Sequence, residues 1–408
     1  MDDTRLIEAK PHAETKPRVP FVILILISAI GPLALNIFVP SMPGLQKAFA
    51  IPYSHAQLTL TLYLIGMAVC QLFYGPLSDR YGRRPMVMTG LVLFTAASAL
   101  AAVSTGIEML IVARLLQALG GAAGLVLSRA MVRDVYDRDK SASVIAYITM
   151  AYVLAPMVAP MIGGFLDEIA GWRASFLFLT LVGLAVSFAA WRTLPETTQA
   201  VSRHAPLLSL EGFVRLLRKR RFVAYVLTIA SASSVFFAFL GGAPHVMIDV
   251  LGYSPKHYGM WFALISIGYM SGNFLSGRYS MKFGIDRLVL AGNLLTLCGA
   301  LIGLAIALSG YLSPAGLFLP MALCAAGNGL TIPNGTAGAI SVDHTLIGAA
   351  AGLAGFLQTG CGAVASQLVG TWQDSEPHAV FWMMAIASIA AVVAHAINLS
   401  GHKLREIH

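Results

Sequence analysis

The sequence is poor in charged residues. Asp, Glu, Lys and Arg make up only 11% of its 408 positions, whereas a typical soluble domain holds about 25%. Hydrophobic residues make up 57% of the chain, and a soluble fold has no interior large enough to hide so much apolar surface. The composition therefore excludes an ordinary soluble protein and predicts a polytopic protein whose surroundings are the lipid bilayer.

Cysteine is also scarce, and all four cysteines lie inside apolar runs, at Cys70, Cys298, Cys324 and Cys361. We interpret them as small packed hydrophobic residues rather than as disulfides or a metal site. A G-x-x-x-x-G-K-[ST] loop is missing, which argues against ATP hydrolysis. A membrane-embedded enzyme would need a metal cluster or a nucleophile with its base, and the sequence offers neither. We expect no enzyme, no metal and no cofactor.

Long apolar runs are abundant, and a run of about 20 residues spans the hydrocarbon core as one helix. The first run is too long for a signal-peptide core and lacks a convincing cleavage site, so we expect it to be retained. A polar, basic stretch separates two sets of six runs, which predicts about twelve transmembrane helices. The runs lie near 21–40, 56–77, 86–104, 107–130, 141–165, 174–193, 222–243, 257–277, 286–309, 314–338, 347–370 and 378–399.

This alternation predicts an all-α membrane protein with two six-helix bundles, and we expect it to be a monomer. The expected division has five parts: a tail at 1–20, a first bundle at 21–194, a linker at 195–221, a second bundle at 222–399 and a tail at 400–408.

The bases are distributed very unevenly among the connections. If both termini are cytoplasmic, the opposite side of the membrane holds only Lys47, Arg173 and Lys256. This asymmetry fits the positive-inside rule and predicts cytoplasmic termini. The net charge of +8 is therefore a topology signal, and we expect no nucleic-acid partner.

A charged stretch, Gly75-Pro-Leu-Ser-Asp-Arg-Tyr-Gly-Arg-Arg84, joins the second and third runs. We expect Gly75 and Gly82 to allow a tight reversal, and Asp79 to accept hydrogen bonds from a helix N-terminus. Arg80, Arg83 and Arg84 mark the cytoplasmic side. The pattern resembles the signature loop between helices 2 and 3 of the major facilitator superfamily. We therefore expect it to gate the cytoplasmic side, with Asp79 bridging the two halves when the cavity opens outward and Arg83 as its local partner. An ordinary basic loop would need bases but not this order of glycines and acid.

A second, weaker copy of this pattern lies after the second run of the second set. Residues 277–284 repeat the glycine spacing, and Lys282 takes the place of Arg80, while Met281 stands where Asp79 would be. The matching position predicts a transporter that is built from two related halves.

Arg114 is the one base placed inside a span. A charge at mid-membrane costs about 2.5–3.5 kcal/mol on insertion scales, so we expect Arg114 to face a cavity or a partner. Gln117 lies three residues further on, on the same helix face. The segment resembles the superfamily's helix 4 motif, which implies that Arg114 binds substrate or takes part in proton coupling. The alternative is a structural arginine that donates to backbone carbonyls.

The fifth run carries two prolines and two glycines in close succession. Pro156 and Pro160 each remove a helix hydrogen bond, and Gly163 and Gly164 allow a neighbouring helix to pack closely. This resembles the superfamily's helix 5 motif, characteristic of antiporters. The alternative is a kinked helix that serves packing alone.

The first run points to one subfamily within this superfamily. Residues 30–43, with later segments at 242–255, 334–339, 348–352 and 356–358, resemble the Bcr/CflA subfamily of drug:proton antiporters. Many members carry aspartate where this chain has Asn36. Every acid of this chain can be placed in a loop, a tail or a helix end, so Asn36, an amide without a usable pKa, replaces the usual proton carrier. The resemblance implies an exporter, but it leaves the proton carrier unassigned.

Other polar or aromatic residues within the runs are candidate cavity liners, with plain helix packing as the alternative for each. They are Tyr63, Phe236, Phe237, Asn328, Asn334 and Gln358. His245 and His395 lie near helix ends, where we expect polar caps.

The basic linker segment 211–221 has the pattern of a short amphipathic helix. It could bind anionic lipid headgroups, but we favour the alternative of a tether between the halves.

The resemblance implies a bacterial inner-membrane transporter that exports small drug-like molecules or metabolites by alternating access, with protons as the possible coupling ion. The alternative is a facilitator or uptake carrier, in which Asn36 and Arg114 bind a small anionic solute.

Overall fold

The computed structural model describes residues 19–136, 138–198, 210–343, 345–376 and 378–403. Within these ranges every regular element is helical. The helices of the first half are α1 (Phe21–Ile37), α2 (Met42–Phe49), α3 (Tyr53–Tyr81), α4 (Arg83–Ala102), α5 (Ile107–Val135), α6 (Arg138–Ala170) and α7 (Arg173–Thr193). Those that follow are α8 (Leu210–Leu217), α9 (Arg220–His245), α10 (Pro255–Phe283), α11 (Ile285–Leu308), α12 (Pro314–Ser341), α13 (Ile347–Gln373) and α14 (Ala379–Lys403).

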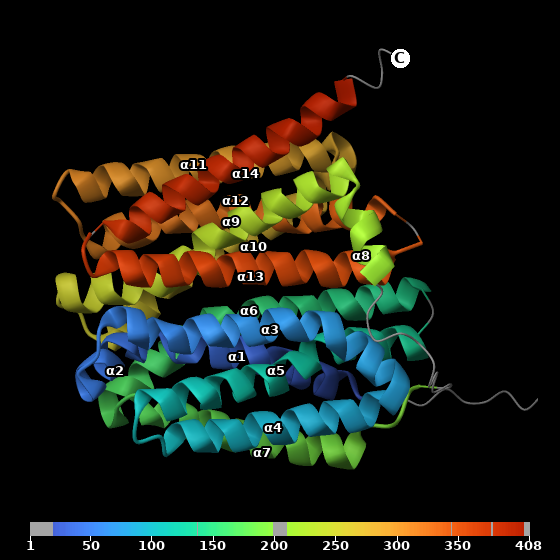
Figure 1. Ribbon diagram of the computed structural model, residues 1–408, viewed down its shortest axis with the longest axis horizontal. Coiled ribbons are helices and arrows are strands. Elements are labelled where there is room, and N and C mark those ends of the chain that lie inside the picture. Colours follow the sequence, from blue (N-terminus) through green and yellow to red (C-terminus); the bar gives the residue numbers. More distant parts are fainter. Residues whose placement is uncertain (1–18, 137, 199–209, 344, 377, 404–408) are drawn as a thin grey trace, which may run out of the picture.

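Ten segments within the described ranges are long and apolar enough to cross a membrane, and the first of them, Phe21–Phe49, joins α1 and α2. Helices α6 and α10 are not among the ten, but with 33 and 29 residues they run alongside the others (Figure 1). Together these segments confirm the predicted all-α membrane fold with about twelve long helices.

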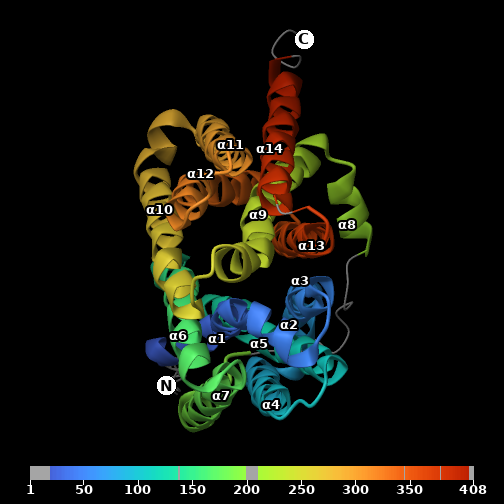
Figure 2. The same cartoon turned by 90° about the vertical axis from the view of Figure 1, so that its left-hand side faces the viewer.

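The long helices form two groups that lie side by side. In Figure 1, α1–α7 occupy the lower half of the view and α9–α14 the upper half. Figure 2 shows that α3 faces α13 and α6 faces α10 across the boundary, and both pairs make extensive contacts. These four helices therefore carry most of the packing between the two halves.

Small residues bring the helices of each half close together. A Cβ atom added at Gly124 of α5 would lie 1.7 Å from the carbonyl oxygen of Ile27 in α1. In the second half, a Cβ at Gly272 of α10 would lie 2.0 Å from the carbonyl oxygen of Ala326 in α12. Such approaches exclude any side chain, so glycine sets the spacing of these helices.

The stretch 75–84 is not the loop that the sequence predicted. Helix α3 continues to Tyr81 and α4 begins at Arg83, so only Gly82, with φ +94°, lies between them. The amide of Gly82 still donates to the carbonyl of Ser78, which keeps the backbone paired up to the turn. Gly75 lies inside α3, and a Cβ there would meet nothing within 4 Å, so its expected part in the reversal is wrong.

The second half repeats this arrangement. Gly284, with φ +80°, is the single residue between α10 and α11, and a Cβ at Gly277 would again meet open space. In both halves the second glycine of the repeat makes the turn.

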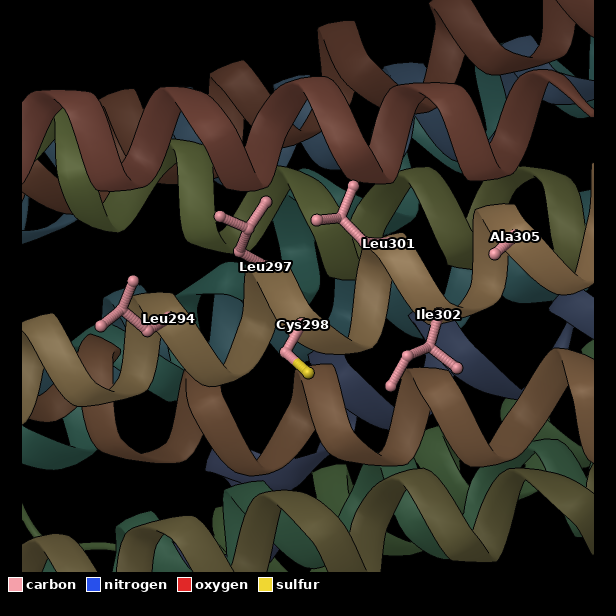
Figure 3. A pocket seen from close by; sticks show the side chains of 6 residues that line it. All are labelled: Leu294, Leu297, Cys298, Leu301, Ile302 and Ala305. Carbon is pink, nitrogen blue, oxygen red and sulfur yellow. The ribbon is translucent and has the colours of Figure 1, made fainter.

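The prediction that the cysteines are packed hydrophobic residues is right for two of the four. Cys70 and Cys324 are buried, but Cys298 and Cys361 are exposed, and all four thiols are free. Figure 3 shows Cys298 on the outer side of α11, in a groove lined by Leu294, Leu297, Leu301, Ile302 and Ala305. Since this groove is apolar, Cys298 faces the same environment as the exposed leucines beside it.

Candidate functional site

Arg114 of α5 is fully buried and is held by three helices of the first half. Its Nη1 donates to the carbonyl of Ala34 in α1 (3.0 Å) and to Oε1 of Gln117 (2.6 Å). Its Nε donates to the carbonyl of Thr59 in α3 (3.4 Å). The spacing of three residues therefore places Gln117 on Arg114, as the sequence suggested.

Aromatic rings surround the same guanidinium. The Cζ atom of Arg114 lies 4.1 Å from the ring centroid of Tyr63, 5.3 Å from that of Phe38 and 5.8 Å from that of Phe176. The hydroxyl of Tyr63 donates to the carbonyl of Gly31 (2.8 Å), which fixes the ring. Ring faces attract a cation within about 6 Å, and more strongly where water is excluded. The rings stabilise the charge here without neutralising it.

The charge of Arg114 has no acidic partner in the described part of the chain, and its Nη2 is buried without a hydrogen-bond partner. Asn36 of α1 is in a similar state: its Nδ2 donates to the carbonyl of Pro32 (2.8 Å), while its Oδ1 is buried and unpaired. Backbone carbonyls do hold Arg114, as in the structural alternative, but one donor remains unused. A buried unpaired donor is costly, and a ligand or water could satisfy it.

Gln117 links this cluster to a fourth helix. Its Nε2 donates to the hydroxyl of Ser98 in α4 (2.7 Å), and that hydroxyl donates to the carbonyl of Phe94 (2.7 Å). This chain of hydrogen bonds fixes the orientation of the amide that accepts from Arg114.

In the second half, α9 brings three of the candidate liners together. Asn328 donates to the carbonyl of Ala232 (3.0 Å), and Gln358 donates to the hydroxyl of the next residue, Ser233 (2.7 Å). Phe236 lies one turn further along α9 and packs edge to face against Phe237, with ring centroids 5.5 Å apart.

Asn334 lies apart from that group. It donates to the hydroxyl of Ser276 in α10 (2.7 Å) and to the carbonyl of Leu330 (2.7 Å). These contacts join α12 to α10, which matches the packing alternative for this residue.

Around the Gly82 turn, Arg83 is the centre of a charge cluster. It pairs with Asp79 (2.6 Å), the local partner that the sequence suggested, and with Asp134 of α5 (3.0 Å). Arg84 donates to the carbonyl of Trp191 (2.9 Å), and Arg80 lies over the ring of Tyr81 at 5.5 Å. Each of these bases therefore has a partner within the first half.

Glu196, rather than Asp79, accepts the hydrogen bonds from a helix N-terminus that the sequence predicted for Asp79. Its carboxylate accepts from the backbone amides of Arg83 (3.0 Å) and Arg84 (3.1 Å), at the N-terminus of α4. The amides of Thr197 and Thr198 donate to it as well (2.9 and 3.0 Å). Burial alone would raise the pKa of Glu196, but these four amides lower it overall. Neither Glu196 nor Asp134 was singled out from the sequence, although an acid directly after an apolar run was a usable signal.

The glycines of the helix 5 motif face different halves. A Cβ at Gly163 would lie 1.7 Å from the carbonyl oxygen of Ile37 in α1. One at Gly164 would lie 2.3 Å from that of Pro255 in α10, which belongs to the second half. Gly259 of α10 approaches Pro160 in return, since its Cβ would lie 2.4 Å from the carbonyl oxygen of that proline. Pro156 also lies inside α6, which continues to Ala170 without a break.

The end of the bundle remote from Gly82, here called the latch end, is closed by polar contacts between the halves. Lys47 of α2 pairs with Asp249 (2.8 Å), and Nδ1 of His245 also lies 3.0 Å from that carboxylate. The hydroxyl of Tyr53 donates to the carbonyl of Gly241 (2.6 Å). We call this set the latch.

Two further contacts between α3 and α13 continue from the latch into the bundle. Gln57 donates to the hydroxyl of Ser366, and Thr61 donates to Gln367 (2.8 Å).

The two histidines near helix ends differ in their surroundings. His245 lies near a helix end, as expected. His395 is fully buried and contacts the carbonyl of Asp286, so the prediction of a polar cap at the surface is wrong for this residue.

The sequence of residues 24–366 matches the model of a family described as Major Facilitator Superfamily. The chain belongs to the major facilitator superfamily. It is 31% identical over 349 residues to multidrug resistance protein D of Escherichia coli, covering 85% of this chain and 87% of that protein. It is 33% identical over 310 residues to a chloramphenicol resistance protein of Pseudomonas aeruginosa, covering 75% and 73%. These relatives confirm the resemblance to the drug-resistance subfamily.

Solved structures of this superfamily share the fold at low identity. A D-xylose–proton symporter superposes with a TM-score of 0.73 at 16% identity, covering 93% of this chain and 96% of that one. A bacterial homologue of the human lysosomal transporter Spinster, in an inward-facing and occupied conformation, gives 0.72 at 13% identity, covering 94% and 96%. Its membership of the major facilitator superfamily makes this chain a multi-pass membrane transporter of small molecules and not an enzyme.

Proposed function

We propose that this transporter exports small drug-like molecules or metabolites across the bacterial inner membrane. The observation that carries the proposal is its similarity, over 85% of the chain, to a protein named for multidrug resistance. The buried Arg114 cluster supports it, because an unpaired donor in a mostly apolar surrounding suits small amphipathic molecules with an electronegative group.

The orientation follows from the charges. The connections at the Gly82 end carry Arg83, Arg84 and the basic run from Arg218 to Arg221, whereas the latch end carries Lys47, Arg173 and Lys256. From the positive-inside rule we propose that the Gly82 end is cytoplasmic, and we keep cytoplasmic termini as part of this proposal. The latch then faces outward.

Alternating access requires the two halves to separate at each end in turn. In the present state the latch is closed, so the next step of export is its opening. That step breaks the Lys47–Asp249 ion pair and the hydrogen bond from Tyr53 to Gly241. Each half moves as a unit, since closely packed glycines join its own helices.

We also propose that the transporter acts as a monomer, with one bundle of helices at 21–194 and a second at 222–399.

The charge at Arg114 sets the substrate preference that we propose. Its guanidinium stays protonated at physiological pH, and Asn36 offers only a neutral acceptor. The site should therefore prefer anionic or electronegative compounds to cations. Protons are the coupling ion that we propose, and their carrier must lie elsewhere than Asn36.

A second candidate is uptake or facilitated diffusion of a small anion, which the lack of an acidic partner for Arg114 also suits. The two functions differ in direction and in driving force. Entry of a labelled anion without a pH gradient, at a rate that a proton gradient does not change, would favour the second candidate.

The experiment is growth of an efflux-deficient strain that expresses this chain, across a panel of antibiotics that includes chloramphenicol. We expect the native chain to raise the inhibitory concentration of some compounds. The Arg114→Ala variant, expressed at the same level, should not raise it. Equal sensitivity with and without the native chain for every compound would contradict the export proposal.

A further inference from the structure

Helix α8 has an apolar face that the described part of the chain leaves exposed. Leu210, Val214 and Leu217 are 68%, 49% and 48% exposed, and their spacing of four and three residues places them along one side of the helix. The opposite side, with Gly212 and Leu216, is buried, and α8 contacts α9 and α13 of the second half. The helix therefore has one face packed on the protein and another that the described residues leave open.

The position of α8 points to what covers that face. Figure 1 shows α8 running across the ends of the long helices rather than along them, and Figure 2 places it at the outer margin beside α13. Only two residues separate its end at Leu217 from Arg220, where the membrane span of α9 begins. A helix at this level, parallel to the membrane plane, lies at the boundary between acyl chains and headgroups.

The orientation of α8 is fixed by a buried carboxylate. Asp343, in the connection between α12 and α13, pairs with Lys219 (2.8 Å) and with Arg215 (3.2 Å). Hydrogen bonds from Lys219 and from Thr345 hold the pKa of Asp343 well below its ordinary value, so the anchor stays ionised. The exposed face cannot rotate inward without breaking these contacts.

Two bases that follow α8 directly in the chain, Arg218 and Arg220, have no acidic partner among the described residues. Arg218 follows Val214 by four residues, so it lies beside the apolar stripe, and its side chain is exposed. Arg220 is exposed too and makes only a long contact (3.4 Å) with the carbonyl of Ile397. Apolar side chains beside uncompensated bases match the acyl region and the anionic headgroups of one leaflet.

We propose that α8 is a binding surface for anionic phospholipid, with Leu210, Val214 and Leu217 in the acyl region and Arg218 and Arg220 on headgroup phosphates. The inference does not depend on the substrate or on the direction of transport. It reverses the preference for a plain tether that the sequence alone favoured.

The first test measures thermal unfolding of the full chain in micelles with increasing phosphatidylglycerol. We compare the native chain with the double variant Arg218→Gln/Arg220→Gln. Each base near an anionic surface strengthens binding by about fivefold. The half-saturating lipid concentration should therefore rise about 25-fold. Phosphatidylcholine in place of phosphatidylglycerol should give no difference between the two proteins.

The matched control removes the same charge at the same end of the bundle. Arg278→Gln/Lys282→Gln neutralises two exposed bases near the Gly284 turn, and its half-saturating concentration should stay within about twofold of the native value. An equal loss in both variants would overturn the proposal, because it would show attraction by overall charge. An unchanged response in the α8 variant would overturn it as well.

A second measurement remains informative if the double variant folds poorly. Val214→Trp adds a reporter on the exposed face while every base is kept, and brominated phosphatidylglycerol should quench the added fluorescence. The reporter Glu211→Trp, on the polar side of the helix, should be quenched at most weakly. Absence of quenching at Val214→Trp would mean that something other than lipid covers the face, and equal quenching by brominated phosphatidylcholine would remove the anionic preference.

Discussion

The adjacent glycines of α6 allow a test of how the latch end opens. In Gly164→Ala the new Cβ would lie 2.3 Å from the carbonyl oxygen of Pro255, 2.8 Å from its carbonyl carbon and 3.0 Å from the Cα of Lys256. Ordinary contacts begin at 3.4 Å, so α6 and α10 must separate by about 1 Å. These helices belong to different halves, and opening the latch end relieves the clash without unfolding either half.

The size of the effect follows from the cost of an extra methyl group. Overpacking at a tight contact costs about 1–3 kcal/mol. If only the closed state bears this cost, the ratio of open to closed molecules should rise about 5- to 150-fold. Gly163→Ala should behave differently, because its Cβ would meet Ile37 of the same half at 1.7 Å. That clash is present in both states, so we expect a lower unfolding temperature and no shift in the equilibrium.

Pulsed electron resonance between nitroxides at Val103 and Tyr311 can measure this ratio. Both side chains are exposed, at 64% and 86%, in connections at the latch end of opposite halves. The nitroxides are attached to cysteines introduced at these two positions, so the exposed native cysteines, Cys298 and Cys361, are first replaced by alanine. The control is Gly360→Ala, whose Cβ would meet nothing within 4 Å. If Gly164→Ala and the control gave the same distance distribution, the tight contact would not hold the latch end closed.

Four further predictions concern polar side chains. Arg114→Ala should abolish export, and Arg114→Lys should restore less than about a tenth of it, because two or more charged hydrogen bonds are lost; equal vesicle transport by the lysine variant would show that a point charge is sufficient. Asn36→Asp should shift preference towards neutral or cationic compounds and steepen the pH dependence in inside-out vesicles; a strong pH dependence of the native protein that the variant leaves unchanged would contradict this account of the site. Asp79→Asn should reduce transport about tenfold at unchanged expression, since a charged pair at the turn is lost, and full activity would refute its part in gating. Glu196, whose folded pKa is lowered, should add stability above its ordinary pKa that is lost as pH falls through the lowered value; unfolding temperatures of Glu196→Gln should lack that pH-dependent loss.

Much of the architecture could be predicted from local patterns. The length of the apolar runs gave the number of helices, and the unequal distribution of bases gave the proposed orientation, because both depend on the contact of each segment with lipid or water. The pairing of Arg114 with Gln117 also followed from the sequence, since three residues along a helix bring two side chains together wherever the helix lies.

Other features could not be obtained from neighbours in the chain. The carbonyl that binds Arg114 belongs to Ala34, 80 positions away, and the carboxylate that caps α4 belongs to Glu196, 113 positions beyond Arg83. Such pairs depend on which helices become adjacent. Nothing in the local sequence distinguishes an acid that caps a helix from one that remains in solution.

The sequence by itself determined that the chain spans a membrane with about twelve helices, and that a lone base lies among them without an acid. Only the tertiary structure decided which half each motif residue serves. Gly163 packs within the first half and Gly164 against the second, although they are neighbours in sequence. The physical reason is that successive residues of a helix point about 100° apart, so the packing of the surrounding helices decides what each one meets.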